Sequence, residues 1–113
     1  MRMDARLPVR FGVLADAREG DAVLLPAGAV PPAGRAVAVL DAGPGHPGGC
    51  ACCPPRNAAA QALGTLFLRR AKGEGPLFRA VLAAVGPADA AAVRAALAED
   101  ALVAGRYRLA ADA

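Results

Sequence analysis

The chain alternates short apolar runs with longer alanine-rich segments, and this alternation restricts the folds open to it. Strand-like runs occupy residues 9–14, 22–25, 36–40 and 77–85, and helix-like segments occupy residues 56–72 and 88–104. Residues 107–109 are compatible with the start of a last strand. Strands that alternate with helices indicate a small α/β layer with a mostly parallel sheet. We therefore predict a single α/β domain over residues 1–113, with three or four short strands and about two helices.

Turn and breaker residues set the expected limits of these elements. The apolar run over residues 36–40 is continuous, which is typical of a strand buried on both faces of a parallel sheet. A loop rich in glycine and proline follows at residues 42–49, and Pro54-Pro55 after it indicates the start of a helix. Gly86-Pro87 marks the start of the second helix, and Gly105 marks its expected end.

Residues that the sequence lacks exclude several kinds of site. There is no serine, which excludes a Ser-His-Asp triad. The only lysine, Lys72, is followed by Gly73, so no Walker A loop is present, because that loop needs Ser or Thr after its lysine. Gly43, Gly45 and Gly48 approach the spacing of a dinucleotide-binding loop, but the prolines between them remove amide donors. We expect no bound nucleotide and favour a protein without catalytic activity.

Charge and hydropathy patterns bear on the possible partners. The formal net charge is +3, carried mainly by scattered arginines, and only 4 % of residues are aromatic. This pattern is more typical of a solvated basic surface than of a nucleic-acid interface. No stretch approaches the roughly 20 apolar residues that cross a bilayer, and the N-terminus carries no secretory apolar core. We predict a cytoplasmic protein with no nucleic-acid or membrane partner.

Three cysteines within four successive residues form the strongest chemical signal in the chain. Cys50, Cys52 and Cys53 follow the glycine-rich loop and precede the expected helix start. The positive end of a helix lowers the pKa of nearby thiols and favours the thiolates that bind metal. His46 stands four residues before Cys50, and three cysteines with one histidine are a recognised zinc set. We predict a zinc site with His46 or water in the fourth position, and Cu(I) is an alternative ion.

The same residues leave other interpretations open. Cys50 and Cys53 form a C-x-x-C pair at a helix start, which is also the arrangement of a thiol redox protein. A further alternative is that the three cysteines are free thiols without a ligand. His46 taken alone fits an exposed loop histidine as well as it fits a ligand.

The sequence from Gly49 to Cys53, Gly-Cys-Ala-Cys-Cys, resembles the metal-binding signature of the CobW-type GTPases, a metallochaperone group among the P-loop GTPases. The resemblance extends over roughly residues 35–109. The further matching positions are Arg56, Ala62-Leu63, Leu66, Arg69-Arg70, Gly73-Glu74, Phe78, Val81, Ala88-Asp89, Val93 and Val103 to Leu109. The resemblance implies a P-loop-GTPase-like α/β sheet and metal handling.

The departures from that family concern the machinery for nucleotides. Residues 15–20, Ala-Asp-Ala-Arg-Glu-Gly, replace the phosphate loop, and residues 1–34 are divergent. Residues 83–86 lack the carboxylate and hydroxyl groups of the family's segment after its third strand. The resemblance therefore implies a truncated metal-binding relative without GTPase activity. The alternative is a non-catalytic pseudo-GTPase module that pairs with a second copy or with a full-length CobW-type partner, because a sheet that ends near Leu109 leaves an open edge.

Overall fold

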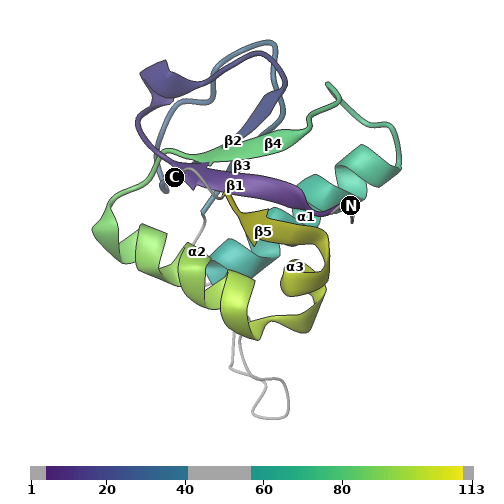
Figure 1. The fold of residues 1–113 in the computed structure, drawn as a ribbon. Coiled ribbons are helices and arrows are strands. Elements are labelled where there is room, and N and C mark those ends of the chain that lie inside the picture. Colours follow the sequence, from purple (N-terminus) through teal and green to yellow (C-terminus); the bar gives the residue numbers. More distant parts are fainter. Residues whose placement is uncertain (1–4, 41–56, 111–113) are drawn as a thin grey trace, which may run out of the picture.

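The computed structural model describes residues 5–40 and 57–110 of this chain. Their strands form one parallel sheet in the order β3-β2-β4-β1-β5 (Figure 1). The strands are β1 (Leu7–Phe11), β2 (Asp21–Leu25), β3 (Val37–Val39), β4 (Ala80–Ala83) and β5 (Tyr107–Leu109). The helices are the 3-10 turn η1 (Leu14–Asp16), α1 (Ala58–Ala71), α2 (Pro87–Glu99) and α3 (Ala101–Arg106). The predicted α/β class with a parallel sheet is confirmed, with five strands and three α-helices in place of three or four strands and about two helices.

The three α-helices pack against one face of the sheet. Alternate strand residues on this face, among them Val9, Leu24 and Val81, join the main apolar cluster with Leu63 of α1 and Val93 of α2. The other face carries a smaller buried set, Val23, Leu25 and Leu82. In Figure 1 the connections on either side of β2 lie across the sheet from α2 and α3. Every residue of β2 is buried, because β2 lies between β3 and β4 and both of its faces are covered.

The strand predicted to be buried on both faces lies at the edge of the sheet. In β3 only Ala38 is buried, whereas Val37 and Val39 are half-buried. The fully buried strand is β2 instead. The prediction for residues 36–40 was correct about a parallel strand and wrong about its place, since a continuous apolar run does not specify which strands flank it.

The second predicted helix, residues 88–104, is divided at Asp100. This residue has extended backbone angles (φ −86°, ψ 116°), and its carboxylate accepts hydrogen bonds from the amides of Leu102 and Val103 at 3.1 and 3.2 Å. It therefore ends α2 and begins α3 as an N-cap. Gly105 does not end the helical segment as predicted, because α3 continues to Arg106 and leads directly into β5.

Tyr107 anchors the last strand to the first long helix. Its side chain is 1 % exposed, and its hydroxyl donates to the carbonyl oxygen of Leu63 at 2.8 Å. Burial raises the pKa of the Tyr107 phenol well above its usual value of 10.0. Phe67 contacts the ring edge-on, with the ring centroids 6.2 Å apart.

Replacing Tyr107 with phenylalanine is expected to lower the free energy of unfolding by about 1 kcal/mol, because one buried hydrogen bond is lost while the ring is kept. The phenol is neutral in the fold, so the native chain should also lose stability as the pH rises beyond about 10, where the unfolded phenol ionises. Urea titrations at neutral and alkaline pH measure both effects. An alkaline loss of stability of the same size in the phenylalanine variant would contradict this assignment.

Candidate functional site

The four predicted metal ligands lie outside the residues that the structure describes. They are His46, Cys50, Cys52 and Cys53. The described chain does fix the two ends of the segment that contains them. This segment leaves the sheet after β3 and enters α1, so it begins at the carboxyl end of a parallel strand. Ligand sites of open α/β sheets lie outside the carboxyl ends of their strands.

Both ends of this segment are held by hydrogen bonds. Leu40 is buried, and its amide donates to the carbonyl oxygen of Leu25 at 2.8 Å. Asn57 caps α1, where its side-chain oxygen accepts from the amide of Ala59 at 2.7 Å. The side-chain amide of Asn57 donates to the carbonyl oxygen of Ala92 at 2.9 Å, which ties the start of α1 to α2. The predicted helix start at Pro54-Pro55 lies outside the described residues; the described helix begins at Ala58.

The carboxylate of Asp16 lies near the carboxyl end of β1. The sequence has no phosphate loop after this strand. The Asp16 side chain accepts a hydrogen bond from the amide of Val13 at 3.1 Å, and η1 forms between them. A Cβ atom added to Gly12 would lie 2.6 Å from an oxygen of this carboxylate, so Asp16 packs closely over the end of the strand. A negative charge at this point disfavours a phosphate group there.

A partly buried ion pair joins the β1–β2 connection to the sheet. The guanidinium of Arg10 donates to both carboxylate oxygens of Asp21, at 2.7 and 3.1 Å, and to the carbonyl oxygen of Asp16 at 2.8 Å. The amide of Arg18 donates to the same carboxylate at 2.7 Å. Burial raises the pKa of Asp21, but the hydrogen bonds from Arg10 and Arg18 and the charges of Arg10 and Arg35 together lower it below its usual 3.8. These contacts give Asp21 a structural role, because both of its carboxylate oxygens accept hydrogen bonds from the chain itself.

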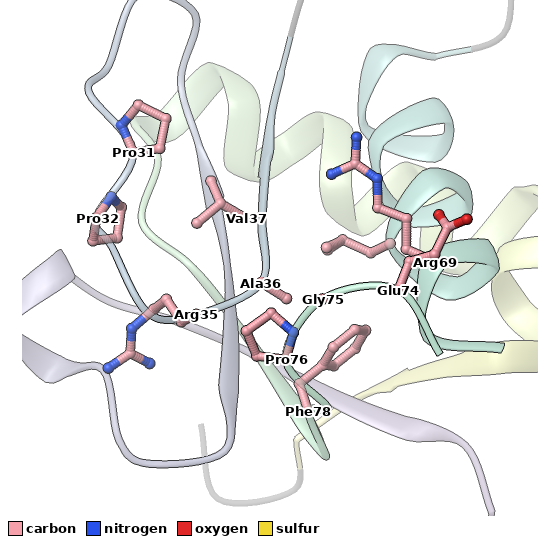
Figure 2. A pocket seen from close by; sticks show the side chains of 11 residues that line it. Pro31, Pro32, Arg35, Ala36, Val37, Arg69, Glu74, Gly75, Pro76 and Phe78 are labelled. Carbon is pink, nitrogen blue, oxygen red and sulfur yellow. The ribbon is translucent and has the colours of Figure 1, made fainter. Parts of the chain in front are cut away.

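The amino end of β3 borders a cavity that the sequence analysis missed (Figure 2). Its volume is about 240 Å³. Pro31, Pro32 and Val37 lie on one side of it, and Arg69 and Glu74 lie on the other. A second hollow of about 390 Å³ continues along β3, and Arg69 and Val37 also line that one. The sequence signal that could have pointed to this region is the pair Arg69-Arg70 in the last turn of α1.

Three other arginines are engaged with aromatic rings of the chain itself. Arg94 lies 4.3 Å from the ring centroid of Phe11, Arg106 lies 4.4 Å from that of Phe67, and Arg70 lies 5.7 Å from that of Phe78. Such cation–π contacts contribute to packing between elements. These three arginines therefore have structural partners, which separates them from Arg69.

Within residues 5–40 and 57–110, no group of three or more His, Cys, Asp or Glu side chains could hold a metal ion. Among the helices of this part of the chain, none is long and apolar enough to cross a membrane. Comparisons of the sequence with protein-family models and with curated proteins, and of the fold with solved structures, find no match. The resemblance to CobW-type GTPases therefore stays a prediction from the residues that carry it.

Proposed function

We propose that this chain is a small metal-binding protein that holds Zn²⁺ through Cys50, Cys52 and Cys53, without GTPase activity. The observation that carries the proposal is the cluster of three cysteines in the connection from the carboxyl end of β3 to the start of α1. Three thiolates within four residues form a donor set that suits zinc, and also Cu(I). With His46 as the fourth ligand the site would be closed, whereas with water it would be open and suited to passing the ion to another protein.

The fold supports this proposal through the fixed ends of the cysteine segment. Asn57 connects the start of α1 to α2 through its hydrogen bond to Ala92, and Leu40 is bonded into the sheet. A segment held at both ends loses less conformational entropy when it closes on an ion than a free chain of the same length. The carboxylate of Asp16 at the end of β1 disfavours a phosphate group there, which supports the part of the proposal that excludes GTPase activity.

Zinc titration of the metal-free protein is expected to give one bound ion per chain, and replacement of all three cysteines by alanine should abolish that binding, because the thiolates supply most of the donors. Competition with a chromophoric chelator measures the affinity. Cobalt substitution reports the ligands independently, since thiolate coordination produces a charge-transfer band that histidine or carboxylate ligands do not.

His46→Ala is the matched variant for the fourth ligand. A weaker site with unchanged stoichiometry identifies His46 as a ligand, and unchanged affinity assigns the fourth position to water. Binding that survives the triple cysteine variant, or no thiol-dependent binding at micromolar concentrations, contradicts the proposed function.

A second candidate, a non-catalytic interaction module, is favoured by the two outer strands of the sheet. Within the described residues, β3 and β5 each pair with one strand only. Outer strands with free backbone groups can add a strand from another chain. Leu109 at the β5 edge is 46 % exposed, and light scattering of the eluted protein determines whether a second copy occupies either edge.

A further inference from the structure

The backbone of β3 has groups on its outer side that pair with no strand of the described residues. The carbonyl oxygen of Ala36 and the amide of Leu40 both bond to β2, at 2.9 and 2.8 Å. In a parallel pair, alternate residues direct their backbone groups toward the neighbouring strand. The amides and carbonyls of Val37 and Val39 therefore face away from β2, where the described residues contain no further strand. An added strand could satisfy them.

A groove runs beside this edge, between β3 and α1. All three residues of β3 line it, and α1 contributes Ala62, Thr65 and Arg69 from one face of the helix. Pro31 closes one end. The volume of about 390 Å³ is large enough for several side chains, and the small side chains of Ala62 and Thr65 leave room for an extended segment.

The amino end of the groove carries positive charge. Arg69 is exposed, and its guanidinium makes no hydrogen bond or ion pair with another described residue. Arg35 lines the adjoining cavity, and one of its nitrogens bonds only to backbone carbonyl oxygens. Glu74 is the one carboxylate among the residues that line this cavity, so the two guanidinium groups leave one positive charge in excess there. Figure 2 shows Arg69 and Glu74 on the helix side, across from Pro31 and Val37.

We propose that the β3 edge binds an extended segment of an acidic partner protein as a sixth strand, with a carboxylate side chain of that segment paired to Arg69. Backbone hydrogen bonds to Val37 and Val39 would supply affinity, and the charge would select the sequence. The net charge of +3 makes an acidic partner a better match than a second copy of this chain. The inference deepens the second candidate function and does not depend on the metal site.

Selection of displayed random octapeptides against the full chain tests this inference. We expect enrichment of sequences that place Asp or Glu among β-branched residues. The dissociation constant of the enriched peptide is then measured by fluorescence anisotropy. Arg69→Gln should weaken binding about tenfold, as expected for a charged hydrogen bond. Lys72→Gln removes an equal charge outside the groove and should leave binding unchanged.

A second pair of variants tests the backbone contact at a single position. Val39→Pro removes the outward amide, whereas Val39→Ala keeps it and shortens the side chain. Binding should be lost in the first variant and retained in the second. Circular dichroism verifies that both variants fold. If Val39→Pro does not fold, Arg69→Gln still tests the inference, because it changes only one exposed side chain.

Three results would overturn the inference. They are enrichment without acidic residues, equal binding by the Arg69 and Lys72 variants, and a self-associated chain whose assembly Val39→Pro dissolves, which would make a second copy the occupant. If peptides bind but no groove variant changes their affinity, the proposed interaction module is retained and the proposed β3 site is rejected. Zinc titration of the Arg69→Gln protein should match that of the native chain, so failure here leaves the metal proposal intact.

Discussion

Replacing Asp21 with alanine is expected to lower the free energy of unfolding by about 3 kcal/mol, as measured by urea titration. The change removes the carboxylate that accepts two hydrogen bonds from Arg10 and balances its charge, and the Arg10 side chain is only 17 % exposed. It also removes the acceptor of the Arg18 amide, which closes the turn before β2. Because small domains have free energies of unfolding of about 5–15 kcal/mol, this loss is a large fraction of the total.

Two controls separate the ion pair from a general effect of charge. Glu19→Ala removes one exposed carboxylate from the same connection and should change stability by no more than about 0.5 kcal/mol. The double variant Arg10→Met with Asp21→Leu should recover much of the loss, since an apolar pair carries no unpaired charge. A single Asp21→Ala variant that is as stable as Glu19→Ala would show that the pair adds nothing to the fold.

The lowered pKa of Asp21 gives the same prediction a pH dependence. A carboxyl group whose pKa is lower in the folded than in the unfolded state stabilises the fold above its unfolded pKa, and this stabilisation is lost as the pH falls. The native chain should therefore lose stability as the pH drops below about 4. The Asp21→Ala variant should show a smaller change over that range, because it lacks the group that titrates.

The apolar runs predicted the strands well but not their places in the sheet. Residues 22–25 and 36–40 have similar composition, yet one became the inner strand β2 and the other the outer strand β3 of the described sheet. Strand order depends on which helices and loops cover each face, and those contacts join residues far apart in the chain. A short run of Ala, Val and Leu gives no information about these long-range contacts.

The division of the second helix was partly readable from the sequence. Asp100 is a favourable N-cap residue, and the apolar residues Leu102 and Val103 follow it. The alanine-rich run before it has high helix propensity throughout and gives no reason to stop. The continuous helix propensity therefore predicts one helix through Asp100, although this residue determines where α3 begins.

The two candidate sites differ in how far the sequence could reveal them. The cysteine cluster was found at once because its residues are adjacent in the chain, and it lies outside the described residues. The groove beside β3 and the cavity that adjoins it combine Pro31 and Arg35 with Arg69, which come from separate segments. The pair Arg69-Arg70 marks one side of this surface in the sequence, but only the fold brings the three segments together.

The core prediction with the largest expected effect concerns Leu24. This side chain is fully buried in the inner strand β2, on the face that the helices cover. Seven of the 18 buried residues of the main cluster are alanines, whose side chains have little freedom to fill a cavity. Leu24→Ala should therefore cost about 3–4 kcal/mol, from the lost apolar burial together with the cavity left behind.

Leu68→Ala is the matched control, because it deletes the same atoms from a side chain of α1 that is 51 % exposed. Its effect should stay within about 0.5 kcal/mol. The chain has no tryptophan, so far-ultraviolet circular dichroism is the suitable measurement of thermal unfolding. A difference of 3 kcal/mol between the two variants corresponds to more than about 10 °C in Tm for a domain of this size. Equal melting temperatures would mean that β2 is not the centre of the core, and the assignment of the two buried faces would fail with it.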